Sequence, residues 1–118
     1  MIEKRSLPRI SVPIRIEYAR PIMHEPKSQA KSTDISLKGL RLVTNNRLKV
    51  DDILDLFFHL PDQPFQEAVG KVVWAKENNG QVDCGVYFLN ISDPVKQNLL
   101  NYIFKYFPKE MENKWWKY

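Results

Sequence analysis

Cysteine and long apolar runs are scarce in this sequence, and their scarcity excludes several classes of protein. A single cysteine, Cys84, cannot form an internal disulfide and reads most simply as a buried small apolar residue, so we expect a reducing, cytoplasmic setting. No run of about 18 apolar residues occurs, which argues against a membrane-spanning helix. The first residues also lack the apolar region of a secretory signal. We therefore predict a cytoplasmic protein without a membrane span.

Catalytic and metal-binding patterns are missing as well. The sequence has no recognisable Ser/His/Asp or Cys/His constellation, no assignable pair of acid and base carboxylates and no P-loop. His24 lies in a polar stretch without a partner cluster of histidine or cysteine, so we interpret it as solvated rather than as a metal ligand. We expect neither an enzyme nor a protein that holds a metal or another cofactor.

The overall composition is that of one small globular domain. The chain has 118 residues, of which 43% are hydrophobic and 27% are charged, enough for one modest core. The formal net charge of +4 is mild and does not by itself indicate nucleic-acid binding. It does suit a site for a dianionic ligand, because a positive field attracts anions.

Alternating apolar residues predict a mainly β protein. Residue 70 is a glycine that interrupts one alternating segment and indicates a bulge or bend, and Asn78-Asn79-Gly80 predicts a hairpin turn. Between the first two strands, residues 20–32 are polar and contain two prolines, which indicates a long loop. The alternating segments are 10–18, 39–43, 53–60, 65–76 and 82–88, with a further strand beginning near residue 31.

The period changes near the C-terminus. Ser92-Asp93-Pro94 is a typical helix start, and Pro108 ends or kinks the helix. A helix with so many apolar residues must pack against another part of the protein, most simply an open end of the folded strands. The tail, 108–118, ends in Trp115-Trp116-Lys117-Tyr118, which predicts packing onto either the domain or a partner or dimer surface. The apolar helical stripe comprises Val95, Leu99, Tyr102, Ile103 and Tyr106, widened by Leu100, Phe104 and Phe107.

The first motif that carries chemistry is R-x-x-x-R, formed by Arg5 and Arg9. A guanidinium presents a planar fork of donors that fits two phosphate oxygens or the O6 and N7 edge of guanine, and it can stack on a base. Pro8 restricts Leu7 toward extended geometry, so residues 1–9 read as an irregular cationic arm. The alternative is an ordinary solvated basic terminus.

The second motif is D-x-S-x-x-G, formed by Asp34, Ser36 and Gly39. In an extended segment the first two side chains share one face. A carboxylate there can accept from the N1–H and N2–H edge of guanine, and a serine hydroxyl can donate to phosphate. Gly39 permits a tight turn or the close approach of a ligand. The alternative is an Asx-type turn in which Asp34 and Ser36 satisfy only backbone groups.

Taken together, these motifs resemble those of the PilZ domain family, and the order agrees over almost the whole chain. Two later stretches, Gly70-Lys71-Val72-Val73-Trp74 and Cys84-Gly85-Val86-Tyr87-Phe88, match less specifically and reflect mainly strands. The resemblance implies a bacterial receptor for the second messenger cyclic di-GMP. It implies a small antiparallel β-barrel of about six strands, Greek-key-like, with the C-terminal α-helix packed on or near the barrel end.

The resemblance also assigns roles to residues. Arg5 and Arg9 would grip the phosphates and a guanine, while Asp34, Ser36 and Gly39 would line the other side of the ligand. Lys4 stands where the family often has another arginine, which leaves open whether one or two ligand molecules bind. Trp74 would pack against a guanine, or else cover the barrel end.

We therefore expect one PilZ-like domain, 1–118, that acts as an adaptor. It would comprise the ligand-binding arm (1–9), the barrel (10–91), the helix (92–107) and the tail. Binding of cyclic di-GMP would order the arm and so build or hide a surface that a partner protein reads. The alternative is a β-barrel that binds nucleic acid or protein without cyclic di-GMP. Nucleic acid is disfavoured because most aromatic residues fall on inward faces or on the helical stripe.

Overall fold

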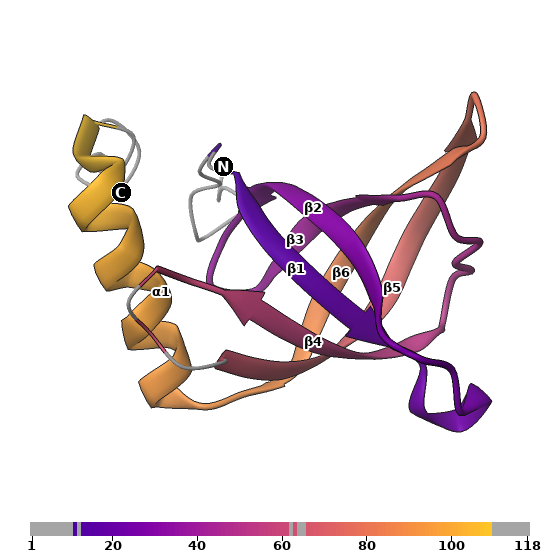
Figure 1. Ribbon diagram of the computed structural model, residues 1–118, viewed down its shortest axis with the longest axis horizontal. Helices are drawn as coiled ribbons and strands as arrows, with labels where there is room; N and C mark the ends of the chain where they lie inside the picture. The colour runs from indigo at the N-terminus through magenta and orange to yellow at the C-terminus, as the bar shows by residue number, and fades with distance from the viewer. Residues whose placement is uncertain (1–10, 12, 62, 64–65, 110–118) are drawn as a thin grey trace, which may run out of the picture.

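Six antiparallel strands close into a barrel with one helix at its end (Figure 1). The computed structural model describes residues 11, 13–61, 63 and 66–109. The predicted mainly β barrel of about six strands with a C-terminal helix is confirmed. The elements are β1 (Ile14–Ala19), the 3₁₀ turn η1 (Pro21–Met23), β2 (Ser28–Ile35), β3 (Gly39–Thr44), β4 (Ile53–His59), β5 (Gln66–Asn78), β6 (Gln81–Ile91) and α1 (Asp93–Tyr106).

The strand order around the barrel is β1-β2-β3-β6-β5-β4. Strands β4, β5 and β6 follow one another as antiparallel neighbours, whereas β3 lies beside β6 and not beside β4. The connection 45–52 carries the chain from β3 to β4, which gives the Greek-key arrangement. This order matters for function, because it brings the D-x-S-x-x-G segment next to the β5–β6 hairpin.

The core follows the period of two in the sequence. Strand side chains alternate between the filled interior and the outer surface, and Cys84 is buried as predicted. One polar pair is accommodated inside, where Tyr18 Oη and Thr44 Oγ1 share a hydrogen bond of 2.7 Å. The largest fully buried side chains are Tyr18, Phe58, Ile14, Ile16, Leu40, Leu42, Leu54, Leu56 and Val72.

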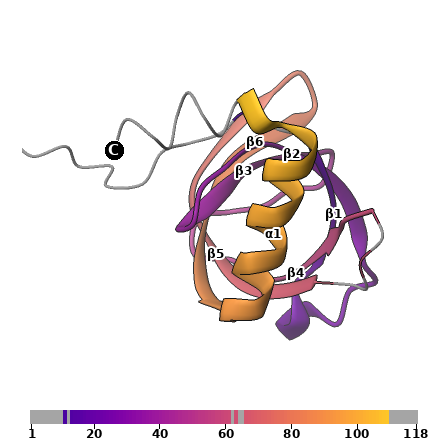
Figure 2. The same ribbon diagram turned by 90° about the vertical axis from the view of Figure 1, so that its left-hand side faces the viewer.

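Helix α1 lies across one open end of the barrel (Figure 2). The hydroxyl of Ser92 accepts from the backbone N–H of Val95 at 3.3 Å, which confirms the predicted cap. Leu99 and Ile103 are buried against the barrel. Phe104 and Tyr106 are 50% and 44% exposed, so their predicted places in the buried stripe are wrong. Phe104, one residue after Ile103, is turned about 100° away from the buried face, and Tyr106 is the last residue of the helix. No helix among the described residues is long and apolar enough to cross a membrane.

Several strand boundaries differ from the predictions. β6 continues to Ile91 and β5 to Asn78, beyond the predicted ends at residues 88 and 76. β2 begins at Ser28, earlier than the predicted start near residue 31, because pairing with β1 extends a polar segment that has no hydrophobic alternation of its own. β1 begins at Ile14, and residues 10 and 12 of the predicted strand lie outside the described residues.

The predicted irregularity at Gly70 and the predicted hairpin turn are confirmed. The register of β5 against β6 shifts between Val69 and Gly70, and again between Val72 and Trp74. In the hairpin, Asn79 and Gly80 both have left-handed backbones, with φ of 52° and 81°. Residues 110–118 of the predicted aromatic tail lie outside the described residues.

Candidate functional site

Four residues from four neighbouring strands form one line across the outside of the barrel. Asp34 on β2 pairs with Arg41 on β3, Arg41 pairs with Gly85 on β6, and Gly85 pairs with Trp74 on β5. Directly paired residues project from the same face about 5 Å apart. We call these four residues the outer row. Their alignment brings Trp74 to the same surface as the D-x-S-x-x-G segment.

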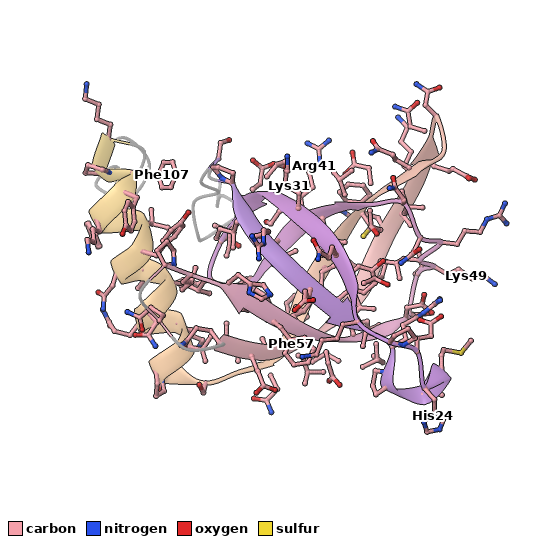
Figure 3. The ribbon with its side chains drawn as sticks, viewed as in Figure 1. His24, Lys31, Arg41, Lys49, Phe57 and Phe107 are labelled. Carbon is pink, nitrogen blue, oxygen red and sulfur yellow. The ribbon has the colours of Figure 1, made fainter. Side chains whose placement is uncertain are left out.

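Arg41 is the electrostatic centre of the outer row. Its Nε and Nη2 donate to Oδ1 and Oδ2 of Asp83 at 2.8 and 2.5 Å, and its Nη1 lies 3.8 Å from Oδ2 of Asp34. The hydrogen bonds from Arg41 lower the pKa of Asp83, and those to Asp83 raise the pKa of Arg41. The guanidinium is thereby fixed between two carboxylates while 41% of the side chain stays exposed. Figure 3 shows Arg41 on the outside of the barrel.

Asp34 is oriented from both sides. Its Oδ1 accepts from the hydroxyl of Ser11 at 3.0 Å, and its Oδ2 faces Arg41. Its side chain remains 22% exposed, so the carboxylate can still accept hydrogen bonds from a ligand. The contact with Ser11 also holds the chain that follows the R-x-x-x-R motif beside the outer row.

Ser36 and Gly39 close the turn between β2 and β3. The backbone N–H of Ser36 donates to the carbonyl of Gly39 at 2.8 Å, and the Ser36 hydroxyl accepts from the N–H of Lys38 at 3.2 Å. Because β2 ends at Ile35, the extended geometry that would put Ser36 on the same face as Asp34 does not reach it. The Ser36 hydroxyl thus has a backbone partner in the turn, whereas the Asp34 carboxylate contacts the side chains of Ser11 and Arg41.

Two glycines allow close approach by the protein's own atoms. A Cβ on Gly39 would lie 2.1 Å from the carbonyl oxygen of Val86, so the β3–β6 pairing itself requires glycine there. A Cβ on Gly85 would lie 2.1 Å from Nε1 of Trp74. The indole therefore lies directly against β6, on the outer wall of the barrel. The alternative position of Trp74, over the barrel end, is wrong.

A shallow depression opens beside the outer row. Its volume is about 160 Å³, and its lining includes Ser36, Gly39, Trp74 and Tyr87. Trp74 is 39% exposed, so one part of its ring system is available to stack on a planar ligand. Pockets that enclose a drug-sized ligand are commonly about 300–1,000 Å³. The depression can therefore enclose only part of a ligand of that size.

The structure brings Ser36, Gly39 and Trp74 to one depression, with Asp34 at the far end of the outer row. Lys4, Arg5 and Arg9 lie outside the described residues, so their predicted roles stay predictions.

Sequence reasoning missed Arg41, Asp83 and Ser11. Arg41 could have been found by counting outward from the turn: once residues 36 and 39 close a hairpin, 35 faces 40 and 34 faces 41. No comparable signal links Asp83 to Arg41 or Ser11 to Asp34, because the first contact depends on the pairing of β3 with β6 and the second on the course of the N-terminal chain.

The groups gathered at the outer row suit recognition. They provide a fixed guanidinium, a partly exposed carboxylate and an exposed indole.

Burial raises the pKa of Cys84 to about 12, so its thiol is protonated at neutral pH. The described part of the chain contains no group of three or more His, Cys, Asp or Glu that could hold a metal ion. His24 stands at the exposed end of η1, where its backbone is left-handed (Figure 3).

Comparison with known families gives one match over most of the chain. The pattern of the PilZ domain matches residues 3–105. This interval includes both sequence motifs, the outer row and almost all of α1. No curated protein matches the sequence.

Several solved structures share the fold at low sequence identity. The PilZ domain with c-di-GMP of YcgR from Escherichia coli is 16% identical, with a TM-score of 0.72, covering 94% of this chain and 97% of that one. YcgR from Escherichia coli in complex with c-di-GMP is 18% identical (TM-score 0.72; 95% and 50% covered). The Bacillus subtilis inhibitor of motility MotI/DgrA is also 18% identical (TM-score 0.72; 88% and 51% covered). The chain thus spans about half the length of the latter two proteins.

Proposed function

This chain belongs to the PilZ domain family, and from that premise we propose that it binds cyclic di-GMP at the outer row and relays the signal as an adaptor. One observation carries the proposal: β-barrel pairing places Asp34, Arg41 and Trp74 on one surface, beside the Ser36–Gly39 turn. The similar fold of the YcgR PilZ domain, which was solved with this ligand, adds support.

Each described group has a chemical role in this proposal. The Asp34 carboxylate accepts from the N1–H and N2–H edge of a guanine, and Trp74 offers the face of its ring to a base. The Ser36 hydroxyl donates to phosphate. Gly39 keeps the turn close to β6, which holds the depression open. Arg41 positions Asp34 by fixing one side of its carboxylate, and adds positive charge near the ligand phosphates.

The R-x-x-x-R motif supplies the missing cover. Arg5 and Arg9 would bind the phosphates and stack on guanine, with Lys4 as a further cation. The bond between Ser11 and Asp34 supports this arrangement, because the two residue steps from Ser11 back to Arg9 can span at most about 7 Å of chain. A small depression at one end of the outer row, and a cationic motif followed by a residue that bonds to Asp34 at the other end, together suit a ligand clamped between two surfaces.

The signal would pass through the arm. Cyclic di-GMP binds the ordered arm more tightly than the unordered arm, so it shifts the population toward the ordered state. The ordered arm builds or hides a surface that a downstream protein partner reads in the cytoplasm. Amide exchange of residues 3–7 and 9 should slow on adding ligand; equal exchange with and without ligand would reject this relay.

The binding step is tested by calorimetric titration of cyclic di-GMP into the wild type and into Arg5→Ala, Arg9→Ala and Asp34→Ala. Loss of one hydrogen bond to a charged group costs about 1.5–3 kcal/mol, so each variant should bind roughly tenfold to hundredfold more weakly. Arg47→Ala, on the connection between β3 and β4, is the matched control and should bind like the wild type. The inflection point gives one or two ligands per chain, which Lys4 leaves open.

Salt dependence separates this proposal from nucleic-acid binding. Binding of single-stranded oligonucleotides through phosphates weakens steeply with salt, whereas base contacts at Asp34 and Trp74 persist. Preference for cyclic di-GMP over a random oligonucleotide should therefore survive high salt. A folded wild type that binds oligonucleotides and shows no heat with cyclic di-GMP would overturn the proposed function.

A further inference from the structure

The distal half of β5, residues 73–78, has a strand neighbour on one side only. β6 pairs with β5 as far as Asn78, but β4 pairs with it only as far as Lys71. The connection 45–52 extends the pairing by one residue, with Asp51 N–H donating to the carbonyl of Val72 at 2.8 Å and Val72 N–H donating to that of Asp52 at 2.9 Å. Beyond Val72 every residue of β5 is exposed.

The hairpin register identifies the unpaired backbone groups. Asn78 and Gln81 flank a two-residue turn and exchange hydrogen bonds, and bonded pairs then alternate along the hairpin. Lys76 and Trp74 consequently face β6, whereas Ala75 and Glu77 direct their N–H and C=O groups away from it. Within the described ranges, no backbone hydrogen bond joins Ala75 or Glu77 to the 45–52 connection. These two residues form a short open edge.

A groove of about 340 Å³ runs along this edge, between residues 75–77 and 47–50. Apolar side chains of Leu48, Val50 and Val82 contribute to its lining. Three cations, Arg47, Lys49 and Lys76, also line it, against the single carboxylate of Glu77.

These three cations lie beside carboxylates that are already paired with other residues. The neighbouring carboxylates already have partners, since Asp51 pairs with Lys71 and Asp52 pairs with Arg20. In the part of the chain that the structure describes, Arg47, Lys49 and Lys76 form no ion pair. Lys76 lies opposite Asp83 in the hairpin and contributes to the lowered pKa of that carboxylate, whose main partner is Arg41. The groove therefore presents net positive charge beside an open strand edge.

We propose that this groove docks an acidic, extended segment of a partner protein, which adds to β5 as a further antiparallel or parallel strand. Its backbone would bond to Ala75 and Glu77, its acidic side chains would meet Arg47 and Lys49, and its apolar side chains would contact Val50. The hairpin projects from the barrel, so a partner can reach this edge (Figure 1).

Two other occupants fit less well. A second copy of this chain would bring the same three cations together, and antiparallel pairing centred on Lys76 would place that residue opposite itself. A nucleic acid could use the cations but would leave the N–H and C=O groups of Ala75 and Glu77 without strand partners.

The test is a ¹⁵N NMR titration of the full chain with an acetylated, amidated heptapeptide of alternating glutamate and valine. We expect the amide peaks of Ala75, Glu77 and Lys49 to shift. The same peptide with alternate backbone nitrogens methylated, which cannot form the strand ladder, should shift them at least tenfold less. No shift at millimolar peptide, or equal shifts with the methylated peptide, would overturn the proposal.

Variants and further probes complete the experiment. Arg47→Gln and Lys49→Gln should each weaken peptide binding roughly twofold to fivefold, as expected for exposed ion pairs. Lys105→Gln removes the same charge from the last turn of α1, at the helix-covered end, and should have no effect. Shifts at the same amides with oligothymidylate, or on raising the protein concentration alone, would assign the groove to nucleic acid or to a second copy and contradict the proposal. None of these measurements depends on cyclic di-GMP.

Discussion

Neighbouring residues on one strand, Leu42 and Arg41, illustrate the difference between the inner and outer faces of this barrel. Leu42 is fully buried and packs in the core, whereas Arg41 holds Asp83 and faces Asp34 on the outer surface. The inner face determines whether the chain folds, and the outer face determines what the folded chain can bind. Substitutions on the two faces should therefore affect different measurements.

The largest effect is expected on the inner face. Leu42→Ala removes a fully buried side chain and leaves a cavity, which should lower the free energy of unfolding by about 2–5 kcal/mol. Urea denaturation measures this loss. The folded fraction should bind cyclic di-GMP within about twofold of wild type, because Leu42 does not reach the outer surface. A large loss of affinity in folded Leu42→Ala would mean that the two faces are coupled.

A position that serves both faces should affect both measurements. Gly39→Ala places a Cβ against the backbone carbonyl of Val86, so we expect a loss of about 1–3 kcal/mol in stability together with weaker ligand binding. Gly80→Ala, at the hairpin tip where a Cβ meets no atom, is the control. It should cost about 1–2 kcal/mol because of its left-handed backbone, and leave the affinity unchanged. Equal affinities for the two variants would contradict this role of Gly39.

The inner face was the more predictable one from the sequence. Alternation of Leu40 and Leu42, and of Val82, Cys84 and Val86, is a local signal with a period of two, and the structure buries all five side chains. The early start of β2 was not predictable in this way, because residues 28–32 pair with β1 through backbone groups that carry no sequence signal of their own. The exposed position of Phe104 likewise depends on where α1 meets the barrel.

On the outer face, Arg41→Ala should change affinity more than stability. Removing the guanidinium releases one side of the Asp34 carboxylate and one positive charge, so cyclic di-GMP should bind roughly threefold to tenfold more weakly. The free energy of unfolding should change by less than about 1 kcal/mol, since the ion pairs of Arg41 are partly exposed. Calorimetry and urea denaturation measure the two effects, and Arg47→Ala serves as the control. An unchanged affinity would remove Arg41 from the site.

The smallest effect concerns pH. The pKa of Asp83 is lowered by its hydrogen bonds from Arg41, so the pair adds stability above the unfolded-state pKa, about 3.9, and loses it as pH falls through the lower folded-state pKa. Asp83→Asn should thus be less stable than wild type at pH 7, by less than about 1 kcal/mol because the pair is solvent-screened. The difference should shrink below pH 4. A difference that stays constant between pH 7 and pH 3 would contradict this ion pair.

The candidate site was predictable only in part. The motif residues Asp34, Ser36 and Gly39 were found because their types and spacing are a linear pattern. Asp83 was not, because its contact with Arg41 arises from the pairing of β3 with β6, strands that are far apart in the sequence. Ser36 illustrates a different limit. Its hydroxyl accepts a hydrogen bond from the turn backbone, and the residue type alone does not tell whether a serine bonds to backbone or to a ligand.

The most direct test of the outer row as the ligand site is a ¹⁵N NMR titration of the full chain with cyclic di-GMP. If the ligand binds at the outer row, the largest shifts fall on residues 34–41 and 85–87 and on the indole N–H of Trp74, while Ala75, Glu77 and Lys49 in the groove shift little. Asp34→Ala should abolish most of these shifts at the same ligand concentration. Shifts that avoid the outer row, or a folded wild type whose spectrum does not change, would show that cyclic di-GMP does not bind there.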